Sequence, residues 1–213
     1  MRKFTLFFIA LFSFVFCISS CNSCKKDKAE QDDVKVTDTL NVENAVSVDR
    51  EHMYLTYGEN YRWFETCIVL KDFLDADSCD GSITGLSNVF EILREKDTGY
   101  DVMCVLTTHT PDTTVLEEKQ AFWVGDFPLN DEQIKVTFKE AFDKVMATNS
   151  PKPHSRQCVL RREVGPVPNV NPQYIFGNVK AQLYVDAVTG DVTDKNPAFP
   201  EDKGFKMPLG EWP

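Results

Sequence analysis

The stretch KVTFKEAFDKVM, Lys135–Met146, decides how the central part of this chain folds. Thr137 is followed three residues later by Glu140, which is the capping-box pattern of a helix N-terminus. The apolar residues of the stretch recur at helical spacing, with charged residues between them: Phe138, Ala141, Phe142, Val145 and Met146. The pattern therefore predicts an amphipathic helix that begins at Thr137 and stops at Asn149-Ser150-Pro151.

Short strands are expected after this helix. Cys158–Val164 and Tyr174–Phe176 are apolar-rich runs, and the run from Ala181 to Val185 alternates between apolar and polar residues. Asp186 and Gly190 then favour a turn, because aspartate initiates turns and glycine adopts a positive φ without strain. The sequence predicts one helix followed by an antiparallel sheet.

This stretch resembles the PepSY domain family at both of its ends. The family's helix begins Thr-x-x-Glu-Ala, as at Thr137, Glu140 and Ala141, and its last strand and turn read as VDAVTGDV does at Val185–Val192. The resemblance implies a PepSY-like domain over residues 131–195. Some PepSY domains sit in peptidase propeptides or are thought to inhibit peptidases, so the resemblance also implies a binding or peptidase-inhibitory role.

A proline-rich insertion, GPVPNVNP at residues 165–172, departs from the family pattern. Prolines reduce the entropy lost when a loop becomes ordered, so this loop is expected to be rigid. We expect it to form the rim of a binding surface made by a sheet edge and a groove beside the helix. The expected rim residues are Gly165, Pro166, Pro168, Asn169 and Pro172.

The first twenty residues read as a signal peptide. Arg2 and Lys3 precede an apolar run from Phe4 to Ile18, which is too short for an ordinary transmembrane helix. Ile18-Ser-Ser-Cys21 resembles the bacterial lipobox, and this resemblance implies lipidation of Cys21. The expected location is then the cell envelope, with the outer membrane favoured, on its periplasmic or surface face. A plain secretory signal cut nearby is the alternative.

Residues 21–50 are polar and charged and predict a flexible tether, because they offer little apolar area to bury. Residues 51–130 read as closely spaced strands, which favours an antiparallel meander. Residues 196–213 carry four prolines and predict an extended tail, either a strap along the domain or a frayed end. No internal repeat is evident. The expected fold is α+β: a β-meander region followed by a small helix-plus-antiparallel-sheet domain.

The composition excludes some functions. A net charge of −10 argues against a nucleic-acid partner. Cys67 and Cys104 lie in predicted strands and can form a disulfide if those strands are neighbours; buried free thiols are the alternative. His52, His109 and His154 are far apart and are expected to be ordinary loop or surface residues. Beyond Cys24 the chain contains no Cys-x-x-Cys, and it contains no P-loop, dinucleotide fingerprint or nucleophile elbow, so no cofactor and no metal are expected.

These patterns favour a non-enzymatic envelope lipoprotein over an enzyme. The first hypothesis is a PepSY-like module, held at a membrane by its N-terminal lipid, that binds a secreted peptidase or an extended peptide. The second is a structural or accessory surface lipoprotein associated with envelope or glycan-handling machinery. The sequence motifs do not distinguish the two.

Overall fold

The computed structural model describes residues 40–96, 99–119, 123, 126–167 and 169–199. Two α-helices and nine strands, with one short 3-10 helix, make up this part of the chain. In order they are α1 (Val42–Tyr57), β1 (Tyr61–Leu70), β2 (Ile83–Lys96), β3 (Gly99–His109), β4 (Thr114–Lys119), β5 (Asp126–Phe127), η1 (Asp131–Gln133), α2 (Phe138–Ala147), β6 (Gln157–Glu163), β7 (Gln173–Asn178), β8 (Ala181–Asp186) and β9 (Val192–Thr193).

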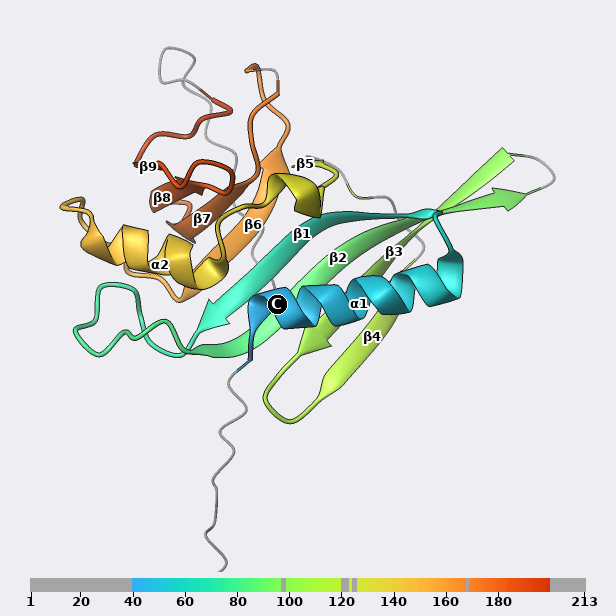
Figure 1. The fold of residues 1–213 in the computed structure, drawn as a ribbon, viewed down its shortest axis with the longest axis horizontal. Coiled ribbons are helices and arrows are strands. Elements are labelled where there is room, and N and C mark those ends of the chain that lie inside the picture. Colours follow the sequence, from blue (N-terminus) through green and yellow to red (C-terminus); the bar gives the residue numbers. More distant parts are fainter. Residues whose placement is uncertain (1–39, 97–98, 120–122, 124–125, 168, 200–213) are drawn as a thin grey trace, which may run out of the picture. The chain divides into compact units, whose positions relative to one another are not determined.

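All the strands belong to one antiparallel sheet, in the order β4-β3-β2-β1-β6-β7-β8-β9, with β5 paired to β6 (Figure 1). The fold is therefore α+β, as the sequence predicts, and β1 to β4 form the expected meander. The sheet does not stop at the boundary expected near residue 130, because β1 pairs with β6 over Glu65–Val69.

The same order of elements occurs twice in the described chain. The sequence does not reveal this repeat. A helix followed by four antiparallel strands occurs as α1 with β1–β4 and again as α2 with β6–β9. The first strands of the two halves, β1 and β6, pair with each other, and each half extends outward from that pair. Among the described strands, the outermost are consequently the last strands of the two halves, β4 and β9.

Helix α1 corrects two sequence expectations, since it occupies the end of the predicted tether and the start of the predicted meander. Asn41 caps it by accepting a hydrogen bond from the backbone of Asn44. Its buried face is small and interrupted by a charged residue, which makes the segment look like a polar linker. The buried residues are Val42, Ala45, Val46, Asp49 and Met53.

Helix α2 confirms the helix expected at Thr137. The Thr137 side chain accepts from the Glu140 backbone, and the Glu140 side chain accepts from the Thr137 backbone. The turn between β8 and β9 also forms as expected, with Asp186 Oδ1 accepting from the backbone of Val188 at 2.8 Å and Gly190 at φ 79°. A Cβ at Gly190 would meet only the flexible end of the exposed Lys144 side chain, so the positive φ rather than space favours glycine there.

Both helices lie on the same face of the sheet, which we call the helix face (Figure 1). One continuous hydrophobic cluster joins α1, α2 and the strands beneath them. The opposite face, called the second face, carries a smaller buried cluster on β1, β6, β7 and β8, formed by Cys67, Val159, Ile175 and Tyr184.

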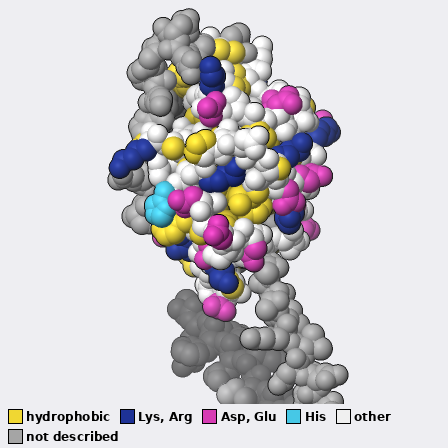
Figure 2. All heavy atoms as spheres, turned by 90° about the vertical axis from the view of Figure 1, so that its left-hand side faces the viewer, with side chains coloured by type: hydrophobic (Ala, Val, Ile, Leu, Met, Phe, Trp, Pro, Cys, Tyr) yellow, Lys and Arg dark blue, Asp and Glu magenta, His cyan; other side chains and the backbone are white. Residues whose placement is uncertain are grey.

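The surface on the α2 side mixes both signs of charge. In Figure 2, basic and acidic side chains alternate, with small apolar patches between them. Within the described ranges, no helix is long and apolar enough to cross a membrane.

Candidate functional site

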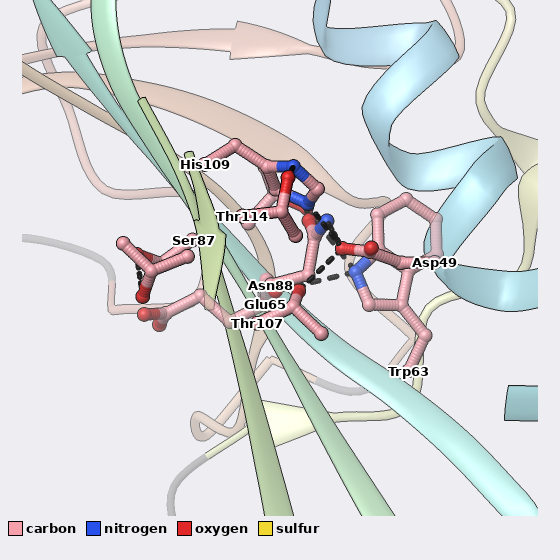
Figure 3. A network of polar contacts seen from close by, with 10 residues as sticks. Asp49, Trp63, Glu65, Ser87, Asn88, Thr107, His109 and Thr114 are labelled. Atoms are coloured by element: carbon pink, nitrogen blue, oxygen red, sulfur yellow. Dashed lines mark hydrogen bonds and ion pairs between the residues drawn. The ribbon is translucent and has the colours of Figure 1, made fainter. Parts of the chain in front are cut away.

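Asp49 lies on the sheet-facing side of α1 and is buried. Its Oδ2 accepts a hydrogen bond from Asn88 Nδ2 at 2.7 Å and another from the Thr107 hydroxyl. His109 Nε2 lies 2.8 Å from the same oxygen (Figure 3). These three partners replace the water that the carboxylate loses on burial, so the charge is tolerated beneath the helix.

The strand register brings these partners together. Asn88 on β2 pairs directly with Thr107 on β3, and Leu86, two residues before Asn88, pairs with His109. Because alternate residues of a strand share a face, all three polar side chains point toward α1 (Figure 3). The only sequence signal was a few polar residues within apolar-rich strands, Ser87-Asn88 in β2 and Thr107-Thr108-His109 in β3.

The network continues from Asn88 into β1. Thr66 donates to Asn88 Oδ1 at 2.5 Å, and the indole nitrogen of Trp63 donates to Thr66 Oγ1 at 3.2 Å. Side chains from α1, β1, β2 and β3 are thereby held in one set of hydrogen bonds. Satisfied buried polar networks of this kind fix one arrangement of the elements they join.

The network reaches the surface at Thr114, an exposed residue. Its hydroxyl oxygen lies 3.0 Å from His109 Nδ1. An ionised carboxylate only accepts, so His109 Nε2 donates to Asp49, and Nδ1 of the same ring faces the Thr114 hydroxyl. His109 is therefore not the surface residue expected from the sequence; it is buried. His52 and His154 are exposed, as expected.

A carboxylate, an imidazole and a hydroxyl in this order can pass a proton, which is the relay that activates hydroxyl nucleophiles in acyl-transfer sites. The same groups also have a structural role here. They connect α1 on one side with the β3–β4 hairpin on the other, through Asp49 and Thr114.

A cleft of about 360 Å³ opens beside this relay, between the N-terminal half of α1 and the β3–β4 hairpin. We call it the α1–hairpin cleft. On the helix side it is lined by Asn41, Asn44 and Val48, and on the hairpin side by His109, Pro111 and Thr114.

Strand β4 forms the outer wall of this region and is exposed at all six residues. It pairs with β3 on one side, and no described strand pairs with its other side. Thr110 and Thr113 exchange backbone hydrogen bonds at the hairpin turn, at 2.8 and 3.4 Å. Because such pairs alternate along an antiparallel ladder, the backbone groups of Thr114, Leu116 and Glu118 point outward, away from β3.

Exposed apolar side chains accompany this edge. Leu116 of β4 is 40 % exposed, and Val48 and Leu55, seven residues apart on one side of α1, are 53 % and 76 % exposed. The Tyr57 hydroxyl donates to Glu118 at the far end, so α1 and β4 run beside each other from Thr114 to Glu118. The edge thus combines outward backbone groups with an apolar lining.

A second polar cluster lies on the second face, around Arg161 of β6. Its guanidinium contacts Glu163 directly, and lies 3.6 Å from Glu65 and 3.7 Å from Asp126. Arg161, Glu65 and Glu163 are each at most 7 % exposed. One cation therefore faces three carboxylates in a buried setting.

The pKa values of two carboxyl groups in this cluster, those of Glu65 and Asp126, are raised. Burial, followed by the charge of Asp126, raises the pKa of Glu65 to about 7, although Arg161 opposes the shift. Burial also raises the pKa of Asp126. Arg161 Nε has no hydrogen-bond partner among the described residues. Protonating Glu65 reduces the net negative charge that the cluster buries.

The cluster fastens two other segments to the sheet. The indole nitrogen of Trp123 donates to Asp126 at 2.9 Å, and Asn196 donates to Glu163 at 2.7 Å. Asn196 belongs to the first part of the expected C-terminal tail, and Ala198 beside it is buried, so residues 196–199 are packed. The rest of the tail lies outside the described residues.

The residues predicted from the sequence do not form one site. Cys21 lies outside the described part of the chain. Cys67 on β1 and Cys104 on β3 are free thiols with β2 between them, so the condition for a disulfide, neighbouring strands, is not met. The alternative, buried free thiols, is what the structure contains, and burial raises the pKa of Cys67 to about 12.

The expected rim loop connects β6 and β7, which are both interior strands, so it does not border a free edge as expected. Within it, Gly165 packs against Ala198 so closely that a Cβ would lie 2.3 Å from the Ala198 oxygen. Asn169 adopts a positive φ of 58°, and the Pro172 carbonyl accepts from Ala187 at 2.8 Å. Pro166 is in the same loop, and Pro168 lies outside the described residues.

No family model, no curated protein and no solved structure matches this chain. The function is therefore inferred from the motifs of the sequence and the geometry of the folded part.

Proposed function

We propose that this chain is a non-enzymatic lipoprotein of the cell envelope, whose folded part binds an extended polypeptide as an additional strand on β4. The lipid on Cys21 holds it at a membrane, with the outer membrane favoured. Residues 131–195 are its PepSY-like part, a proposal supported by the capping box at Thr137 and the turn at Asp186–Gly190.

The observation that carries the binding role is the exposed outer side of β4. Unpaired backbone groups on a sheet edge form hydrogen bonds with an extended peptide, and nearby apolar pockets select its side chains. On β4, the outward groups of Thr114 and Leu116 lie near the exposed side chains of Val48 and Leu55. The binding surface proposed from the structure therefore lies in the first half of the sheet, away from the rim loop expected from the sequence.

The test of strand addition uses the full-length protein in detergent and a fluorescently labelled octapeptide that alternates valine and threonine. Saturable binding is expected by fluorescence anisotropy. Replacing Leu116 with Pro removes one outward N–H while keeping the ladder to β3, because prolines are tolerated on edge strands. This variant is expected to weaken binding at least about tenfold.

The matched control is Leu116→Thr, which keeps the N–H and introduces a β-branched side chain that suits a strand. It should retain most of the binding, and both variants should keep the wild-type thermal midpoint within a few degrees. Equal binding by wild type and Leu116→Pro would remove β4 from the mechanism. Absence of binding to any extended peptide would favour the structural-lipoprotein hypothesis instead.

A separate experiment tests the anchor. Lipid chains insert with about 0.8 kcal/mol per buried CH₂, so several acyl chains hold a protein firmly. Cys21→Ala should move the protein to the soluble fraction and abolish labelling by a fatty-acid probe, whereas Cys24→Ala should change neither. Membrane retention of the Cys21 variant, with no labelling of wild type, would contradict the lipobox interpretation.

A further inference from the structure

A cavity of about 200 Å³ lies on the helix face where the two halves of the fold meet, and we call it the seam cavity. Val42 and Val46 of α1 line one side, and Ile134, in the segment that leads from η1 to α2, lines another. The strands β1, β6 and β7 contribute the residues beneath. The cavity therefore depends on the pairing of β1 with β6, which brings the two halves together.

The interior of the seam cavity is apolar. Leu160 of β6 pairs with Tyr174 of β7, and Trp63 comes from β1. All three are at most 4 % exposed. In another protein, an apolar cavity of roughly 150 Å³ binds benzene. The seam cavity consequently has room for one aromatic ring, and the exposed residue Ser47 lies at its opening to solvent.

The polar groups inside the cavity already have partners. The indole nitrogen of Trp63 donates to Thr66 Oγ1 at 3.2 Å, and the Tyr174 hydroxyl donates to the Val136 carbonyl at 3.1 Å. A polar ligand would lose its hydrogen bonds to water and gain none from these groups, which is unfavourable. An apolar ligand loses nothing of this kind.

The charged groups at the opening are paired as well. Arg50 of α1 forms an ion pair with Asp131 of η1, which joins the two halves across the opening. Glu43 accepts the hydrogen bond from the Phe138 backbone at 2.7 Å. A charged ligand would have to break one of these interactions to be compensated, so the lining favours an uncharged one.

We infer that the seam cavity binds one small, uncharged aromatic molecule about the size of toluene. The rings of Trp63 and Tyr174 offer aromatic contacts, which add to the burial of apolar area. The ligand contacts α1 and β1 of the first half and β6 and β7 of the second. This site is separate from the β4 edge, so it does not depend on strand addition.

The test uses 4-fluorotoluene and the full-length protein in a nonionic detergent, followed by fluorine NMR. Empty micelles give the signal of ligand dissolved in detergent, which is subtracted. Saturable binding with a Kd of about 1 mM or tighter is expected. 4-Fluorobenzylamine and 4-fluorobenzoate carry opposite charges on the same ring, and each should bind at least about tenfold more weakly.

Two variants fill the cavity from different sides. Val46→Phe adds a ring from α1, and Ile134→Phe adds one from the segment before α2. Each should weaken the binding of 4-fluorotoluene at least about tenfold and keep or raise the thermal midpoint, because filling a cavity commonly stabilises a fold. The matched control is Val48→Phe, which adds the same ring at a position that is 53 % exposed, and it should bind as wild type does.

The inference is overturned if wild type binds no 4-fluorotoluene, or if a folded Val46→Phe or Ile134→Phe variant binds it as well as wild type. If one of these variants fails to fold, the other decides. Tighter binding of either ion would overturn the uncharged class of ligand. Leu116→Pro should bind 4-fluorotoluene as wild type does, so the seam cavity and strand addition at β4 fail separately.

Discussion

The carboxylate of Glu43, in the first turn of α1, accepts a hydrogen bond from the backbone nitrogen of Phe138, the first residue of α2, at 2.7 Å. An acidic residue of the first half of the fold therefore stabilises the N-terminus of the helix in the second half. Helix N-termini carry unpaired N–H groups and partial positive charge, so a carboxylate there is favourable. This bond links the two halves on the helix face, while β1 and β6 link them within the sheet.

Replacing Glu43 with Ala should lower the free energy of unfolding by about 1 kcal/mol, the usual effect of losing a helix cap. Urea unfolding followed by circular dichroism measures it. Glu51→Ala, on the exposed side of the same helix, is the control and should stay within about 0.5 kcal/mol of wild type. Equal effects at the two positions would mean that the Glu43 contact does not stabilise the fold.

The buried network predicts a larger effect at Asp49. Asp49→Ala removes the acceptor shared by Asn88, Thr107 and His109 and leaves those groups buried without it, so the free energy of unfolding should fall by about 3 kcal/mol. The chain contains an exposed counterpart, in which His154 Nδ1 lies 3.0 Å from Asp75. Asp75→Ala should cost less than about 1 kcal/mol, because surface pairs contribute little. Similar losses for both variants would contradict the network's structural role.

The Arg161 cluster predicts a pH dependence of stability. The pKa of Glu65 is about 7 in the folded state and 4.5 as its ordinary value, so between these values the folded chain binds more protons. The stabilisation is fully present below pH 4.5 and is lost as pH rises through about 7, and it amounts to about 3 kcal/mol.

Urea unfolding at several pH values between 4.5 and 8 tests this prediction. Glu65→Gln should remove most of the slope, whereas Glu132→Gln, at an exposed position, should keep it. Asp126 contributes in the same direction, because burial raises its pKa too, so some slope should remain in the Glu65 variant. An unchanged slope in Glu65→Gln would show that this residue does not titrate in that range.

The relay from Asp49 through His109 to Thr114 allows a direct check of the non-enzymatic proposal. The full-length protein should hydrolyse a chromogenic acetate ester no faster than free imidazole at the same concentration. Thr114→Val, which removes the hydroxyl, should leave that rate unchanged. A faster wild-type rate that Thr114→Val abolishes would contradict the proposal and assign acyl-transfer chemistry to this relay.

The elements that the sequence predicted well are those with local signals. Helix α2 follows from a capping box and apolar residues at helical spacing, and the turn at Gly190 follows from its need for a positive φ. Helix α1 was missed because its buried side includes a charged residue, Asp49, whose partners lie far away in the chain. Sequence periodicity cannot distinguish such a helix from a polar linker.

The candidate site was not predictable for a related reason. The pairing of β1 with β6, and the approach of α1 to the β3–β4 hairpin, are contacts between distant segments with no local pattern. Pairing of β1 with β6 makes β6 an interior strand and leaves β4 and β9 as the outer strands of the described sheet. If β6 did not pair with β1, the loop at residues 165–172 would border a free edge of the sheet, which is what the sequence led us to expect.

Hydrogen exchange of the β4 amides tests the central proposal most directly. The full-length protein is compared with and without the valine–threonine octapeptide, by mass spectrometry of fragments covering residues 114–119 and 173–178. The outward N–H groups of Thr114 and Leu116 should exchange roughly tenfold more slowly with peptide bound, while β7, an interior strand, should be unchanged. Binding of the peptide with no slowing in residues 114–119 would contradict strand addition at β4.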